Sequence, residues 1–108
     1  MEIKEYQEYA LRTMNKELTK EEMLLNGLIG LCGESGEAID ILKKHLFHKH
    51  ELDRDHLIEE LGDIAWYLSE ASSALDITLE EVLKRNIEKL SKRYEGGFSS
   101  EKSINRKK

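Results

Sequence analysis

The sequence predicts a single all-α domain built from four main helices. The chain has 108 residues, which is the length of one small domain with a single core. It contains no proline, and it is rich in Leu, Glu, Lys and Ala, which are strong helix formers. It also has few of the β-branched runs that favour strands. These observations together exclude a second independent domain and favour an all-helical chain.

The first predicted helix extends roughly from Ile3 to Glu17, because its apolar residues fall on one helical face. These residues are Ile3, Tyr6, Ala10, Leu11 and Met14. The second helix begins after Thr19, which can form a capping box with Glu22 three residues later. Such a box satisfies free N–H groups at a helix start. We expect the second helix to continue to about Phe47.

A polar stretch over residues 48–54 predicts a loop after the second helix. Either Asp53 or Asp55 is the expected N-cap of the third helix. The apolar pattern then continues to about Leu75, where we expect this helix to end.

The fourth helix begins at a second capping box, formed by Thr78 and Glu81, and extends to about Tyr94. The remaining chain is polar and ends in three basic residues. We therefore predict a folded domain over residues 1–98 and a polar basic tail over residues 99–108, extended or mobile.

The second and third helices are apolar around much of their circumference, which indicates burial on more than one side. A chain this short lacks the additional helices that would cover them. We therefore expect the bundle to be completed by assembly, as a homodimer or a tetramer.

Composition and charge exclude several classes of protein. The chain carries 17 Lys and Arg against 22 Asp and Glu, a net charge of −5, whereas DNA-binding modules usually have a basic excess. Its one cysteine forms no internal disulfide, and no run approaches the roughly 18 apolar residues of a membrane span. The charged N-terminus lacks a signal peptide's apolar core. We expect a cytoplasmic protein that binds neither nucleic acid nor membranes.

Two pairs of carboxylates stand out on the most apolar helices. Glu34 and Glu37 are three residues apart, as are Glu60 and Asp63, so each pair shares a helical face. If the two helices pack antiparallel, the pairs converge. Carboxylates brought together repel one another and lose solvation, so they take up protons or bind a cation. Oxygen ligands at this density suit a hard cation, Mg²⁺ or Mn²⁺.

Glycines recur every third residue in the second helix. They are Gly27, Gly30, Gly33 and Gly36. Each glycine lowers the stability of a helix by roughly 0.8–1 kcal/mol relative to alanine, so we expect the strip to serve another purpose. A strip of small residues allows another helix or a ligand to approach the backbone closely, and Gly62 between the second acid pair has the same effect. For Gly27 and Gly30, close helix packing without a ligand is the simpler interpretation.

Other interpretations remain open at this stage. With 22 acidic residues, acid pairs arise by chance and are usually solvated, so a non-catalytic helical interaction domain and a structural metal-binding bundle are the alternative functions. The histidines near the second loop allow three interpretations: a zinc site, a loop that contacts phosphates, or simply a solvated loop. They are His45, His48, His50 and His56.

Three segments resemble a known family. GLIGLCGESGE over residues 27–37, EELGDIAWYL over 59–68 and the stretch 86–98 are similar to the MazG-like nucleoside triphosphate pyrophosphohydrolases. This family belongs to the all-α NTP pyrophosphatase superfamily, with the dimeric dUTPases and dCTP pyrophosphatases. The resemblance covers roughly residues 5–100.

The resemblance implies a Mg²⁺-dependent enzyme, with Mn²⁺ as a possible substitute. Water would attack the α-phosphorus of a nucleoside triphosphate, giving the monophosphate and pyrophosphate. The implied metal ligands are Glu34, Glu37, Glu60 and Asp63. Of these, Glu37 and Glu60 are the candidate catalytic residues. The metal would neutralise the phosphates and lower the pKa of a bound water.

The resemblance also implies substrate-binding residues. They are Asn26, Lys44, Tyr67, Asn86, Lys89 and Arg93, and the resemblance allows the last three to come from a neighbouring subunit. Lys89 and Arg93 also fit an ordinary basic last turn, and Lys44 a solvated surface lysine. The chain departs from the family in two places. Glu95 replaces a frequent proline, and Gly33 stands where some relatives carry a glutamate, so the general base is not assigned.

Overall fold

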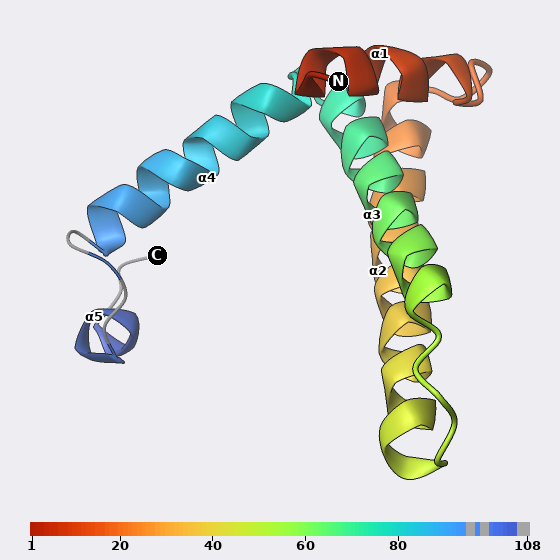
Figure 1. The fold of residues 1–108 in the computed structure, drawn as a ribbon. Helices are drawn as coiled ribbons and strands as arrows, with labels where there is room; N and C mark the ends of the chain where they lie inside the picture. Colours follow the sequence, from red (N-terminus) through yellow and green to blue (C-terminus); the bar gives the residue numbers. More distant parts are fainter. Residues whose placement is uncertain (95–96, 98–99, 106–108) are drawn as a thin grey trace.

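The computed structural model describes residues 1–94, 97 and 100–105, and its fold is all-α, as predicted. The described residues form four main helices and one short one and contain no strand (Figure 1). The helices are α1 (Ile3–Arg12), α2 (Lys20–Phe47), α3 (Arg54–Ala74), α4 (Leu79–Arg93) and α5 (Ser100–Ile104). None of the described helices combines the length and apolar character needed to cross a membrane.

Side-chain caps fix the starts of three helices. At α2, Thr19 accepts a hydrogen bond from the N–H of Glu22 at 3.1 Å, and the Glu22 carboxylate accepts from the N–H of Thr19 at 2.9 Å. Asp53 caps α3 and Thr78 caps α4, each accepting from the N–H three residues later. The predicted capping box at Thr19 is therefore confirmed, and Asp53 rather than Asp55 is the N-cap of α3. At α4 the Thr78 cap is present, but the return hydrogen bond to the Glu81 side chain that completes a capping box is not formed.

The first helix is shorter than predicted, because it ends at Arg12 instead of Glu17. The Thr13 hydroxyl donates to the carbonyl of Ala10 at 2.9 Å, and Asn15 Oδ1 accepts from the N–H of Glu17 at 3.0 Å. These local hydrogen bonds compete with helical ones and turn the chain. The turn also docks α1 on α3, because the Trp66 indole N–H donates to Thr13 Oγ1 at 2.7 Å.

Helices α2 and α3 form a long antiparallel hairpin, with their axes side by side (Figure 1). Two glycines of the strip allow this close approach. A Cβ on Gly27 would lie 3.0 Å from the backbone nitrogen of Ala71, and a Cβ on Gly30 would overlap the Tyr67 ring. Gly33, Gly36 and Gly62 have open space at the same position, so only part of the glycine strip serves helix packing.

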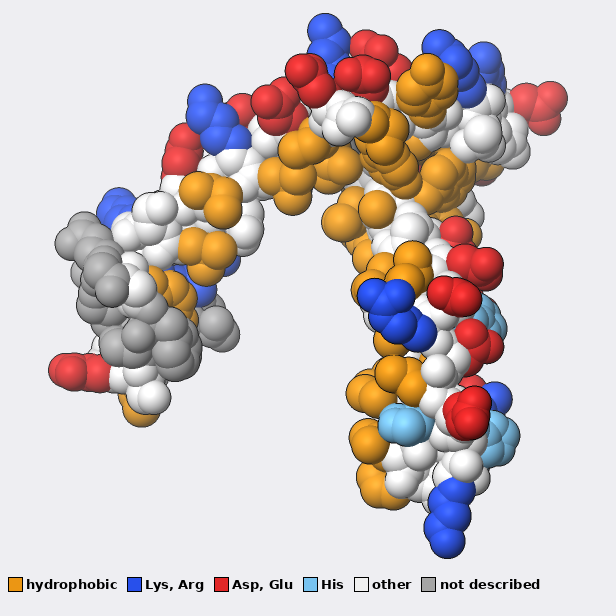
Figure 2. Space-filling view, in the orientation of Figure 1, with side chains coloured by type: hydrophobic (Ala, Val, Ile, Leu, Met, Phe, Trp, Pro, Cys, Tyr) orange, Lys and Arg blue, Asp and Glu red, His pale blue; other side chains and the backbone are white. Residues whose placement is uncertain are grey.

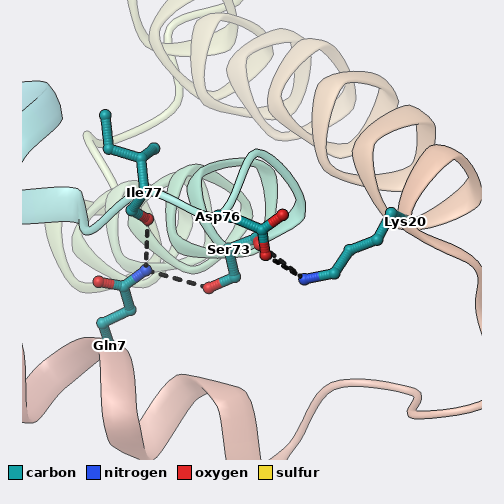
Figure 3. Close-up of polar contacts among 5 residues, drawn as sticks. All are labelled: Gln7, Lys20, Ser73, Asp76 and Ile77. Atoms are coloured by element: carbon teal, nitrogen blue, oxygen red, sulfur yellow. Dashed lines mark hydrogen bonds and ion pairs between the residues drawn. The ribbon is translucent and has the colours of Figure 1, made fainter.

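Gln7 joins α1 to the corner between α3 and α4 (Figure 3). Its amide nitrogen donates to Ser73 Oγ at 3.0 Å and to the carbonyl of Ile77 at 3.3 Å. Its amide oxygen accepts from the N–H of Leu79, the first residue of α4, at 2.8 Å. Beside it, Lys20 Nζ donates to Asp76 Oδ1 at 2.8 Å. These contacts set the direction in which α4 leaves the hairpin.

The core of one chain is small and lies where α1 crosses this corner. The buried hydrophobic residues are Ala10, Met14, Ala71, Ala74 and Leu79. Helix α4 diverges from the hairpin (Figure 1), and Figure 2 shows hydrophobic side chains on the facing sides of the two limbs. The surface of 8530 Å² exceeds the roughly 6,200 Å² typical of a monomer of this mass. The radius of gyration, 16.8 Å, exceeds the roughly 13 Å of a compact chain of this length.

The C-terminal segment differs in part from the predicted tail. Residues Ser100–Ile104 form the short helix α5, so this part is not extended. Residues 99 and 106–108 lie outside the described residues. The boundary at residue 98 stays a prediction.

Candidate metal centre

Three of the four predicted acidic ligands meet between α2 and α3. The α2 residues Glu34 and Glu37 and the α3 residue Glu60 each place a carboxylate oxygen within 4.8 Å of the others. The convergence follows from antiparallel packing, which brings the two acid-bearing faces together. Glu60 is 6% exposed, Glu34 is half-buried and Glu37 is exposed, so the group lies at the edge of the hairpin interface.

Asp63 lies at the margin of this group rather than within it. It is exposed, and its oxygens are not among those that meet within 4.8 Å. Its charge nevertheless contributes to raising the pKa of Glu34. Burial and the Asp63 charge also raise the pKa of Tyr6 on α1. The Asp63 charge therefore acts both on the carboxylate cluster and on Tyr6 of α1.

The cluster contains two oxygens that no protein group satisfies. Glu34 Oε2 and Glu60 Oε2 are both buried, and neither has a hydrogen-bond partner. The nearby Glu60 carboxylate raises the pKa of Glu34 to about 7, helped by burial and by the charges of Glu37 and Asp63. The same contact holds the pKa of Glu60 below its ordinary value. Carboxylate oxygens gathered in this way suit a hard cation such as Mg²⁺ or Mn²⁺.

His56 contacts the cluster from the loop side. Its Nε2 lies 3.1 Å from Glu60 Oε1, and its Nδ1 lies 3.9 Å from Asp53 Oδ2. None of the four histidines belongs to a metal-type group among the described residues. Instead, His45 Nδ1 bonds the backbone oxygen of His50 at 2.9 Å, which holds the end of α2 against the loop. A zinc site formed by these histidines therefore has no support in this geometry.

A pocket of about 580 Å³ opens beside the cluster. It is lined by Gly33, Gly36, Glu37, Asp40, Ile41, Lys44, His50, Glu51, Asp53 and His56. Lys44 lies in its wall and pairs with Asp40 at 3.1 Å, and this contact holds the pKa of Asp40 below its ordinary value. The open glycines Gly33 and Gly36 make room for the pocket, because a side chain at either position would project into it.

Asn26 and Tyr67 lie along the same hairpin, closer to α1 than the cluster. Tyr67 follows Asp63 by one turn of α3 and packs against Gly30. Asn26 donates to Glu70 Oε1 at 2.8 Å. Polar residues thus continue from the carboxylate cluster along the α2–α3 interface. Their role in substrate binding stays a prediction.

Three predicted substrate-binding residues lie elsewhere in this single chain. Asn86, Lys89 and Arg93 belong to α4, which extends away from the hairpin (Figure 1). None of them lines the pocket beside the cluster. Their assignment stays a prediction that involves a neighbouring subunit.

Sequence reasoning missed two residues of this region. His56 precedes Glu60 by four residues and so shares its face, which the grouping of the four histidines does not reveal. The other residue is Glu70, which is 1% exposed. It follows Asp63 by seven residues and therefore lies on the acidic face of α3. Helical spacing could have identified both.

The fold and the cluster define a class: an all-α hairpin with a glutamate-rich centre suited to a hard divalent cation. The chain belongs to the MazG nucleotide pyrophosphohydrolase domain family, whose model matches residues 19–98. It is similar to the Gene 37 protein of Mycobacterium phage L5, with 38% identity over 82 residues, or 72% of each chain. No solved structure shows a significant match to this chain.

Proposed function

We propose that the protein is a Mg²⁺-dependent pyrophosphohydrolase that converts a nucleoside or deoxynucleoside triphosphate to its monophosphate and pyrophosphate. Water attacks the α-phosphorus, and Mn²⁺ can replace Mg²⁺. Membership of the family supports the reaction class. The observation that carries the proposal is the pair of buried, unsatisfied oxygens of Glu34 and Glu60, which lie beside a pocket of about 580 Å³.

In this proposal Glu34, Glu37, Glu60 and Asp63 hold the cation, with Glu37 and Glu60 as the catalytic pair. The bound cation supplies charge neutralisation for the triphosphate and activation of the attacking water. Glu37 belongs both to the cluster and to the pocket wall, so it would hold the cation at the edge of the pocket. Lys44 on the same wall is the pocket residue proposed to approach the phosphates.

We further propose that the active form contains a second copy of the chain. The excess surface of one protomer is about 2,300 Å² over a typical monomer, which matches what one partner contributes to a large obligate interface. Apolar side chains line the facing sides of α4 and the hairpin (Figure 2), where a partner's helices would complete the bundle. In such a dimer, Asn86, Lys89 and Arg93 are proposed to reach the partner's pocket.

The test is pyrophosphate release from a panel of nucleoside triphosphates, including dUTP, dCTP and oxidised dGTP, with Mg²⁺ and with Mn²⁺. We expect turnover of at least one compound to monophosphate and pyrophosphate. Glu37→Gln should reduce kcat at least about 100-fold, since it removes a cluster carboxylate. The matched control is Glu59→Gln, an exposed acid on α3 outside the cluster, which should keep full activity.

Two outcomes would contradict the proposal. If no triphosphate is cleaved by folded protein with either cation, the domain is not this enzyme. Tight Mn²⁺ binding in that experiment would favour a structural metal-binding bundle, whereas weak binding would favour a non-catalytic interaction domain. Equal activity of Glu37→Gln and wild type would place the chemistry elsewhere.

A further inference from the structure

We propose that His56 is a positioning residue of the metal centre, which fixes the Glu60 carboxylate so that one oxygen faces the other acidic ligands. This inference rests on the proposed metal centre and assigns a role to a residue outside the four carboxylates. It concerns how the centre is held, and it does not require the chain to act on any particular nucleotide.

The two carboxylate oxygens of Glu60 have different surroundings. Oε1 lies 3.1 Å from His56 Nε2, one helical turn earlier on α3. Oε2 is buried, has no hydrogen-bond partner and belongs to the residue that meets Glu34 and Glu37. Because an ionised carboxylate oxygen only accepts, Nε2 carries the hydrogen in this contact. The bond therefore fixes the rotation of the carboxylate about its last torsion.

A second carboxylate lies near the other side of the imidazole, beyond hydrogen-bond distance. Asp53 Oδ1 accepts from the backbone N–H of His56 at 3.2 Å, which is the N-cap of α3. Asp53 Oδ2 lies 3.9 Å from His56 Nδ1. The order is thus carboxylate, imidazole, carboxylate, from the helix cap to the cluster. Partners of this kind orient metal ligands in other proteins, and their loss typically weakens metal binding about 10–100-fold.

The exposure of the His56 side chain indicates that it positions Glu60 and is not needed for folding. The His56 side chain is 50% exposed and lines the pocket, whereas the Glu60 side chain is 8% exposed. Removing the imidazole leaves no closed cavity in the core, so we expect little change in folding. It does free Glu60 Oε1, and the carboxylate can then rotate away from the cluster.

The experiment is a calorimetric titration of the full metal-free chain with Mn²⁺, without nucleotide. We expect His56→Ala to weaken Mn²⁺ binding about 10–100-fold while the melting temperature of the metal-free protein stays close to that of wild type. His56→Gln supplies an N–H at the same i,i+4 spacing and should recover most of the affinity. The matched control is His48→Ala, an exposed loop histidine outside the pocket, which should bind Mn²⁺ as wild type does.

Asp53→Asn separates the helix cap of Asp53 from its negative charge. Asparagine caps helices as well as aspartate does, so α3 should start at the same residue. The charge that faces His56 Nδ1 is lost, and we expect a weaker Mn²⁺ affinity than in wild type but a smaller loss than in His56→Ala.

Several results would overturn the inference. One is Mn²⁺ affinity of His56→Ala within twofold of wild type, and another is a His56→Gln variant no better than His56→Ala. A directly coordinated nitrogen in the electron spin-echo spectrum of bound Mn²⁺ would make His56 a ligand instead. Because binding is measured without nucleotide, weaker binding in His56→Ala supports the inference even if no triphosphate is hydrolysed.

Discussion

Glu59 and Glu60 are neighbours in the chain, yet they face different surroundings. Successive helical residues are about 100° apart, so Glu59 points to solvent while Glu60 points into the hairpin interface. There Glu60 meets two acids on one side and an imidazole on the other. The result at the level of single residues is that the nearby Glu60 carboxylate, together with burial, raises the pKa of Glu34 to about 7.

This shift predicts how the metal-free protein responds to pH. Since the folded pKa of Glu34 lies above the unfolded value of about 4.5, its contribution to stability is fully present below pH 4.5 and is lost as the pH rises through about 7. We therefore expect the melting temperature in a chelating buffer to fall across this range. Saturating Mg²⁺ should remove the dependence, because the cation replaces the proton. Thermal melting from pH 5 to pH 8, with and without Mg²⁺, measures both effects.

Glu34→Gln is the control for this pH prediction. A glutamine amide resembles the protonated carboxyl group and carries no charge, so the melting temperature of the metal-free variant should depend much less on pH between 5 and 8. An unchanged slope in this variant would show that other groups cause the effect.

At the scale of single helices, the glycine strip of α2 divides into two halves with opposite expected effects on stability. Gly30→Ala should destabilise the metal-free protein, because a Cβ there overlaps the Tyr67 ring. Gly33→Ala should stabilise it by up to about 1 kcal/mol, since the position is open and alanine is the better helix former. Urea unfolding of the two variants at one protein concentration tests the pair. Equal changes in the free energy of unfolding for the two variants would contradict this division of the glycine strip.

Gln7 predicts a further effect at this scale, because one side chain connects three helices. Gln7→Ala removes three hydrogen bonds and leaves the buried N–H of Leu79 without an acceptor, so we expect a loss of about 2–4 kcal/mol. Gln7→Glu keeps that acceptor and should lose less. The measurement is urea unfolding, and a loss below about 0.5 kcal/mol for Gln7→Ala would contradict the role.

The sequence predicted helix starts better than helix directions. Thr19 and Thr78 cap their helices through residues three positions away, so the signal is local. The end of α1 was misplaced, because Thr13 and Asn15 turn the chain with side-chain hydrogen bonds that apolar spacing does not reveal. The direction of α4 was not predictable, since it depends on Gln7, about 70 residues away.

The candidate site was also predictable only where the signal is local in the sequence. The i,i+3 spacing placed each acid pair on one face, and antiparallel packing then brought Glu34, Glu37 and Glu60 together. The marginal position of Asp63 depends on how far the helices are rotated against each other, which spacing alone does not determine.

At the scale of the whole molecule, one chain is open rather than compact, with a small core and a large apolar surface. If a second copy covers that surface, folding and association are linked, and the apparent stability depends on protein concentration. We therefore expect sedimentation at twice the chain mass of 12.6 kDa. Wild-type protein that sediments as a stable monomer at tens of micromolar would contradict the proposed assembly.

A charge on the apolar face should disrupt this assembly. Ile87 on α4 is 61% exposed, and Ile87→Lys should give a monomer or an unfolded chain, because a lysine would be buried without a partner. Glu88→Lys is the matched control, since the neighbouring position is already polar and exposed, and it should remain a dimer. Sedimentation of the two variants is the measurement, and a stable Ile87→Lys dimer would exclude this face from the interface.

The docking of α1 has a spectroscopic consequence. The chain's one tryptophan, Trp66, donates its indole N–H to Thr13 Oγ1 at the end of α1 and lies three residues after Asp63. Its ring also meets the Tyr67 ring edge to face, with centroids 5.1 Å apart. The intrinsic fluorescence of the unlabelled protein is therefore a built-in optical probe of this joint. Loss of the Thr13 contact shifts the emission, so stopped-flow mixing can follow α1 in real time.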